Sequence, residues 1–190
     1  MGLLTIREEC TASMIARLQA IGLEVSTDTL DDIPVTVAKG SELRKLDSKT
    51  TAGFAAASLF VPGMGVPSAF KVFYSVVIAF RESVTQQSVE HFSARAYAYS
   101  DQMKKGTHSK GIACIPVLLT NNAPDDAKTW VRKKAQSHYN VAIIPVIIDL
   151  VRGEFAYLEK IPLQMRVFFI PGLQLVESCI RTPPQQPALS

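Results

Sequence analysis

Two apolar segments of nearly the same pattern constrain the fold of this chain most. Residues 113–119 read Ala-Cys-Ile-Pro-Val-Leu-Leu, and 29 positions later residues 142–148 read Ala-Ile-Ile-Pro-Val-Ile-Ile. Residues 124–138 between them have the pattern of a helix. A strand, a helix and a second strand of this kind form neighbouring parallel strands covered on both faces. We therefore predict an α/β protein with a mixed central sheet, parallel strands near 112–120 and 142–149, and helices on both faces.

The chain before these segments alternates between helix and strand patterns. Gly22 ends the first predicted helix, Asp31 and Asp32 mark a turn, and Ser83 is the expected N-cap of a long helix. The predicted order is a helix over 1–20, strands over 23–27 and 35–38, a loop or short exposed helix over 39–50, a strand over 72–80 and a helix over 83–105. The order predicts a sheet that is built from both halves of the chain.

The last part of the chain completes the predicted domain. Residues 154–159 alternate between polar and apolar side chains after the Arg152-Gly153 turn, which predicts a hairpin strand at the sheet edge. A helix is expected after Pro171 and Gly172. We predict a single α/β domain over 1–181 and a disordered tail over 182–190, whose composition is typical of disorder.

The apolar segment 51–70 is the most unusual part of the composition. From Thr51 to Phe80 the chain has a single charged residue, Lys71, and the segment is broken by prolines and glycines. A membrane-spanning helix needs about 20 uninterrupted apolar residues, so we do not expect integral membrane insertion. The segment fits core, a surface that faces a protein partner, or a surface that faces a membrane.

Bulk properties exclude little. The formal charge of +3 is too small to predict nucleic-acid binding by itself, and the three cysteines form no C-x-x-C pair. The three histidines have no metal-ligand spacing, and no phosphate-binding glycine motif occurs. We expect a cytoplasmic protein with no resident metal and no cofactor.

The carboxyl ends of the predicted strands offer the best position for a ligand, because open α/β sheets bind ligands there. Side chains at these ends would suit a small polar or anionic ligand, or would instead cap turns. The ligand-binding candidates are Thr120, Asn121, Asn122, Asp149, Arg81 and Ser83.

Basic residues form two further groups that could follow a phosphate backbone. The nucleic-acid-binding candidates are Lys104, Lys105, Lys110, Arg132 and Lys133. Acidic residues such as Asp125 and Asp126 stand among them, so an ordinary solvated helix face is the alternative.

The order of elements over residues 5–150 resembles the core of the restriction-endonuclease-like superfamily, the PD-(D/E)xK nucleases. In that family the third strand carries an acidic residue and a lysine in an E-x-K pattern, which bind a metal ion and activate water. The corresponding positions here are Ile78 and Phe80, and Asp31 and Asp32 are the nearest candidates for the aspartate of the preceding strand. The resemblance therefore implies a nuclease-like core with a degenerate site. The alternative is an unrelated α/β fold, such as a doubly wound sheet built on the same β-α-β unit.

These patterns favour a non-catalytic binding or interaction module, whose partner is another protein or a second copy of the chain. One alternative is a metal-dependent nuclease that uses Mg²⁺ and carboxylates at new positions, drawn from Asp31, Asp32 and Glu82. Another is a peripheral membrane protein that uses the segment 51–70.

Overall fold

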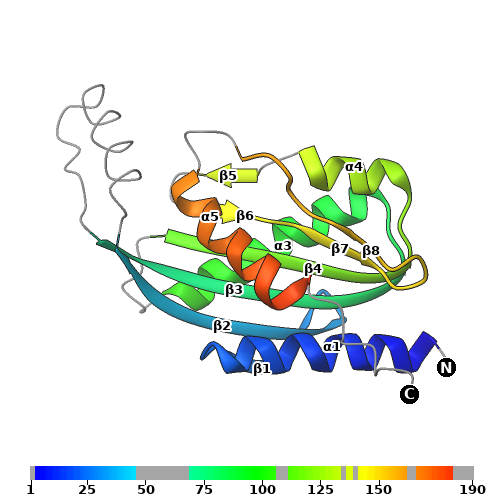
Figure 1. Cartoon of the computed structure of the whole chain (residues 1–190), viewed down its shortest axis with the longest axis horizontal. Helices are drawn as coiled ribbons and strands as arrows, with labels where there is room; N and C mark the ends of the chain where they lie inside the picture. The colour runs from blue at the N-terminus through cyan, green and yellow to red at the C-terminus, as the bar shows by residue number, and fades with distance from the viewer. Residues whose placement is uncertain are drawn as a thin grey trace, which may run out of the picture.

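The protein is an α/β structure with one mixed sheet of eight strands among the described residues. Figure 1 shows the sheet with helices packed against it. The computed structural model describes residues 3–45, 69–105, 111–133, 136–138, 141–161 and 166–181. Residues 51–68 of the apolar segment and the predicted tail 182–190 lie outside the described residues. The predicted fold class is confirmed.

The two similar apolar segments form parallel neighbours at the centre of this sheet. The first is β4 (Gly111–Asn122), and the second is divided into β6 (Val141–Ile143) and β7 (Val146–Asp149). Both β6 and β7 pair with β4 in parallel, through pairs such as Ala113 with Ala142 and Val117 with Val146. Ten consecutive residues of β4 are buried, because helices cover both of its faces.

The prolines explain why the second segment is divided. Pro145 has no N–H for the sheet and lies between β6 and β7, while the Ile144 N–H still donates to the Cys114 carbonyl at 2.9 Å. Cys114 and Pro116 direct their backbone groups to the same neighbour, since that direction repeats every second residue. The missing N–H of Pro116 therefore faces the break in the neighbouring strand, between β6 and β7.

An antiparallel meander forms the other half of the sheet. Its strands are β1 (Glu24–Leu30), β2 (Ile33–Lys45) and β3 (Ala69–Ser83), and β3 pairs in parallel with β4. Asp31 and Asp32 form the tight turn, both with positive φ, which aspartate tolerates better than most residues. The prediction of a loop or short exposed helix over 39–50 is wrong for residues 39–45. These residues belong to the long strand β2 and pair with β3.

The helices on one face of the sheet are α3 (Gln86–Lys104) and α4 (Asp125–Lys133). The predicted N-cap is wrong, because Ser83 ends β3 and Thr85 caps α3 in a reciprocal pair of bonds with Ser88. The helix predicted to reach residue 138 ends at Lys133, and β5 (Gln136–His138) follows as an edge strand antiparallel to β6.

The other face carries α1 (Leu3–Ala20), α5 (Arg166–Leu175) and the π-helical turn η2 (Val176–Ile180). Helix α5 begins before Pro171 rather than after it, which corrects the predicted start. The predicted edge strand is confirmed in a shorter form as β8 (Glu154–Ala156), antiparallel to β7. Among the helices that the structure describes, none combines the length and apolar character needed to cross a membrane.

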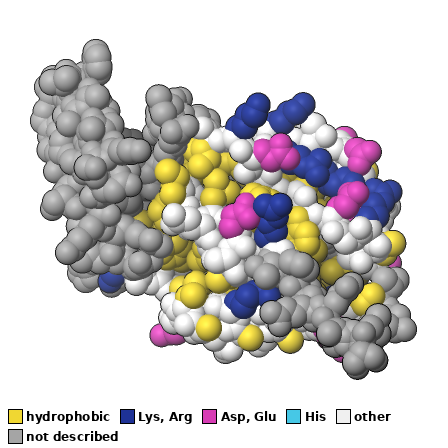
Figure 2. Space-filling model, viewed as in Figure 1, with side chains coloured by type: hydrophobic (Ala, Val, Ile, Leu, Met, Phe, Trp, Pro, Cys, Tyr) yellow, Lys and Arg dark blue, Asp and Glu magenta, His cyan; other side chains and the backbone are white. Residues whose placement is uncertain are grey.

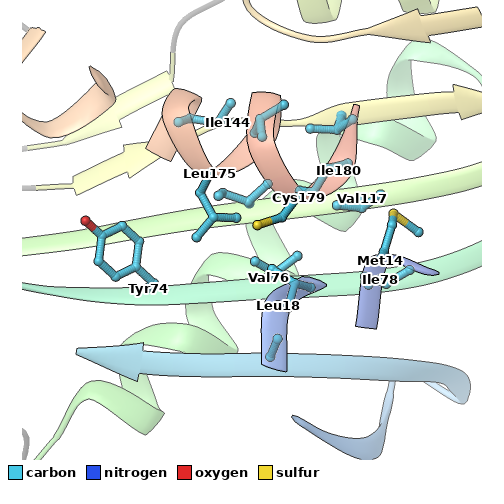
Figure 3. Packing of buried hydrophobic residues seen from close by; sticks show 14 of the residues in the cluster. Met14, Leu18, Tyr74, Val76, Ile78, Val117, Ile144, Leu175, Cys179 and Ile180 are labelled. Carbon is cyan, nitrogen blue, oxygen red and sulfur yellow. The ribbon is translucent and has the colours of Figure 1, made fainter. Parts of the chain in front are cut away.

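Helices thus cover both faces, and two apolar clusters form the core. The cluster on the α1 side contains Met14, Leu18 and the apolar residues of η2, and the other joins α3 and α4 to the opposite face of the sheet. Figure 3 shows side chains of α1, β3 and η2 meeting in the first cluster. Burial of each large apolar side chain stabilises the fold by roughly 1.5–3 kcal/mol relative to leaving it in water.

Candidate functional site

The parallel strands end together, so the structure brings several predicted ligand-binding residues to one edge. Arg81 of β3 is paired with Thr120 of β4, and Thr120 is paired with Asp149 of β7. Arg81, Ser83 and Asn122 are exposed, whereas Thr120 and Asp149 are fully buried. Position alone therefore does not make every one of these side chains accessible to a ligand.

Asp149 is occupied by backbone groups. Its Oδ1 accepts hydrogen bonds from the N–H groups of Val151 and Arg152, at 3.1 and 3.0 Å, and its Oδ2 accepts one from Ala123 at 3.2 Å. The Arg152 guanidinium also donates to the Ala123 carbonyl at 3.3 Å. The carboxylate joins the β7–β8 turn to the β4–α4 junction, which is the turn-capping role that aspartate often has.

Thr120 has a similar role where β3 and β4 end. Its hydroxyl lies 3.2 Å from the carbonyl oxygens of Glu82 and Asn122, and it accepts a bond from the Asn122 N–H at 3.2 Å. The Asn122 carbonyl in turn accepts from the Val84 N–H at 3.2 Å. These polar groups satisfy backbone atoms as the strands separate.

Glu82 and Asn121 form a separate pair at the same edge. The Asn121 Nδ2 donates to the Glu82 Oε1 at 2.9 Å, and the Asn121 Oδ1 is buried without a hydrogen-bond partner among the described residues. Asp31, another acidic candidate, is held by the guanidinium of Arg95 on α3, which lowers the pKa of its carboxyl. Asp32 is exposed in the hairpin turn.

The acidic candidates therefore have different environments. Within the part of the chain that the structure describes, no three histidine, cysteine or carboxylate side chains gather to hold a metal ion. Asp31, Asp32 and Glu82 accordingly do not form such a group with one another.

Strand β3 presents apolar side chains at the two positions where the resemblance predicts the E-x-K pattern. Ile78 is 3% exposed, and Phe80 is half-buried beneath the guanidinium of Arg7, whose Cζ lies 4.7 Å from the ring centroid. The residue paired with Ile78 on β2 is Thr36, which is paired in turn with Thr27 on β1. A cation and hydroxyls therefore border this part of β3.

These residues line a hollow of about 430 Å³ between the start of α1 and the meander, which we call the α1 groove. Its lining residues are Arg7, Thr11, Thr27, Asp28, Pro34, Val35, Thr36, Ile78, Ala79, Phe80 and Leu119. Asp28 contributes no carboxylate to it, since that group bonds to the Tyr99 hydroxyl of α3 on the opposite sheet face. This bond lowers the pKa of Asp28, and burial together with the bond raises the pKa of Tyr99 to about 12.

Sequence reasoning missed the α1 groove. Arg7 falls within the helix predicted over 1–20, and nothing in its local sequence indicates Phe80 as its neighbour. Thr27 and Thr36 lie at equal distances on either side of the turn predicted at Asp31 and Asp32. This symmetry is the one feature of the sequence that indicates two hydroxyls side by side on the sheet.

The predicted nucleic-acid-binding residues are interleaved with acidic ones. The Arg132 Nε lies 3.2 Å from the Glu159 Oε1, and Lys133 borders a hollow of about 620 Å³ with Asp125 and Asp126. Lys105 is exposed, Lys104 is partly buried, and Lys110 lies outside the described residues. Lys128 is buried between Asp125 and Glu154, which raise its pKa.

A further surface lies over α5. Ile161, Ile170 and Leu173 border a shallow hollow of about 680 Å³ together with Gln174, Glu177 and Ser178, and we call the three apolar residues the α5 patch. Figure 2 shows hydrophobic side chains gathered over α5, while lysines and arginines lie toward α4. The patch is accessible, since Ile170 is 38% exposed.

The fold and these surfaces define an α/β protein with a mixed sheet, a basic groove beneath α1 and an apolar patch on α5. No protein-family model matches the chain, and no similar protein is found among curated proteins or solved structures.

Proposed function

We propose that this chain is a non-catalytic binding module on a nuclease-like α/β framework, with the α1 groove as its binding site. The observation that carries the proposal is the pair Ile78 and Phe80 in the groove, with the Arg7 guanidinium over the phenyl ring. Hydrolytic Mg²⁺ sites are built from carboxylate oxygens. A groove bordered by an arginine and threonines suits recognition of a ligand better than metal-assisted hydrolysis.

The element order supports the nuclease-like framework. Helix α1 precedes a meander of three strands, and α3 then leads to β4, which is parallel to β3. This is the order on which the resemblance to the PD-(D/E)xK nucleases depends. The framework remains a proposal, since a doubly wound sheet shares the β-α-β unit.

The catalytic alternative is a nuclease whose carboxylates have moved, with Glu82 as its most central candidate. Incubation of the full chain with DNA and RNA, in Mg²⁺ and in Mn²⁺, separates the two. We expect no cleavage above that of Glu82→Ala prepared in the same way. Metal-dependent cleavage by the wild type that Glu82→Ala loses would overturn the proposal and establish the nuclease.

For the protein partner, we propose the α5 patch as the contact surface and a second copy of the chain as the partner. Support comes from Ile170, which is exposed, and from Ile161 and Leu173, which are partly buried and border the same shallow hollow. Nucleic-acid binding by the basic residues and membrane contact by the segment 51–70 stay predictions.

A further inference from the structure

We propose that the α1 groove binds a small aromatic anion, with Arg7 holding its acidic group and Ile78 and Phe80 contacting its apolar ring. This inference rests on the proposed binding function and names the ligand class. It depends on three observations, which are the state of Arg7, the row of side chains beside it, and the size of the hollow.

Arg7 has a cationic group that is available to an anion. The face of its guanidinium lies over Phe80, and this contact leaves the N–H groups at the guanidinium edge free to donate. Within the described residues no carboxylate pairs with Arg7. A guanidinium edge of this kind matches the two oxygens of a carboxylate or phosphate.

The neighbouring side chains form a polar-to-apolar row across three strands. Thr27, Thr36 and Ile78 are successive partners in the sheet register, and they share the face toward α1. The hydroxyls of Thr27 and Thr36 have no hydrogen-bond partner among the described residues. A ligand there would meet hydroxyl donors at one end and an apolar floor at the other.

The hollow has the size and the charge for this ligand. Its volume of about 430 Å³ lies at the lower end of the range for small-molecule sites, about 300–1,000 Å³. The only carboxylate residue on its border, among those described, is Asp28, whose side chain is bonded to Tyr99 across the sheet. The groove therefore favours an anion over a cation.

The test is a titration of the full, ¹⁵N-labelled chain with phenyl phosphate and with benzoate, which separate the two sources of the acidic group. Phenol and inorganic phosphate serve as the ring and the acidic group alone. We expect saturable binding of at least one aromatic anion, with amide shifts centred on residues 27, 36 and 78. Phenol and inorganic phosphate should each bind at least about tenfold more weakly.

Substitutions of residues that line the α1 groove test whether the ligand binds there. Arg7→Gln should weaken binding by about tenfold or more, because a hydrogen bond to a charged group is lost. Arg7→Lys should give an intermediate loss, and Thr36→Val about a threefold loss with the same shape. Lys39→Gln is the control, since it removes a positive charge from β2 on the α3 side of the sheet, where its partner Ser75 bonds to Ser100.

Several results would overturn the inference. These are no saturable binding of either aromatic anion, amide shifts centred away from the groove, and equal losses in Arg7→Gln and Lys39→Gln. Thermal unfolding and circular dichroism show whether each variant is folded. If Arg7→Gln is not folded, the loss of binding in Arg7→Lys is compared with that in Lys39→Gln instead. Failure of anion binding without metal-dependent cleavage would reject the ligand class alone, whereas cleavage would reject the proposed function itself.

Discussion

At the scale of single residues, polar side chains have two different roles in this protein. Asp149 and Thr120 are polar residues at strand ends, and the structure uses both to satisfy backbone groups. Arg7 lies in the α1 groove and has no carboxylate partner among the described residues. The difference is burial and the number of neighbouring backbone N–H groups, which residue type does not reveal.

Replacement of Asp149 tests its structural role. We expect Asp149→Ala to lower the free energy of unfolding by about 3 kcal/mol, because three backbone N–H groups lose their acceptor in a buried place. Urea denaturation measures this. Glu9→Ala, at an exposed position of α1, is the control and should stay within about 0.5 kcal/mol. A loss for Asp149→Ala as small as that of the control would contradict the role.

The Tyr99–Asp28 pair predicts a pH dependence. The folded pKa of Tyr99 is raised to about 12, above an unfolded value of about 10. Its contribution to stability is therefore fully present below about pH 10 and is lost as the pH rises toward 12. A near-ultraviolet absorbance titration should show one tyrosine ionising near pH 12 that Tyr99→Phe removes. An unchanged titration in Tyr99→Phe would contradict this assignment.

At the scale of elements, local pattern predicted the centre of the sheet better than its borders. The apolar segments at 113–119 and 142–148 predict buried strands by themselves, and the structure confirms both. Residues 39–45 are polar and extend β2 only because residues 69–75 lie beside them. Residues 136–138 form β5 through pairing with β6. Contacts between distant parts of the chain decide these ends.

Contacts between distant parts of the chain also decide which features of the candidate site the sequence predicts. The sequence predicted the edge where β3, β4 and β7 end, and the register confirms that these ends meet. It did not predict the α1 groove, because the groove needs the docking of α1 against the meander. A separate contact joins α1 to η2, since the Arg17 Nε donates to the Cys179 carbonyl at 2.8 Å.

Two leucines of α1 test this docking. Leu18 is fully buried in the core, whereas Leu4 in the same helix is 64% exposed. We expect Leu18→Ala to lower the free energy of unfolding by roughly 3 kcal/mol, since it leaves a cavity. The matched variant Leu4→Ala should change it by less than about 0.5 kcal/mol. Equal effects of the two variants in urea denaturation would contradict the packing of α1.

At the scale of the whole molecule, both candidate surfaces belong to elements on the same face of the sheet. Helix α1 borders the α1 groove, α5 carries the α5 patch, and α1 contacts η2, which continues from α5. Figure 1 shows α5 crossing in front of the sheet and α3 passing behind it, and the two core clusters place α1 on the side of α5 and α4 on the side of α3. A ligand beneath α1 and a partner on α5 would therefore act on the same layer of helices.

If the chain self-associates through the α5 patch, a charged residue in the patch should change the mass of the particle in solution. Ile170→Glu should convert a concentration-dependent dimer into a monomer in sedimentation experiments, because a charge in an apolar contact is costly. Val151→Glu is the matched control, since Val151 is 58% exposed on the β7–β8 turn away from the patch. A wild-type monomer at all concentrations, or a dimer that Ile170→Glu leaves intact, would reject this partner.

We propose that the α1 groove recognises a ligand and holds no catalytic metal ion. The most direct measurement is titration of the ¹⁵N-labelled chain with paramagnetic Mn²⁺, which broadens the amide signals near any bound ion. We predict no selective broadening at residues 78–82 beyond the general effect on exposed amides. Selective, saturable broadening centred on those residues would contradict the claim.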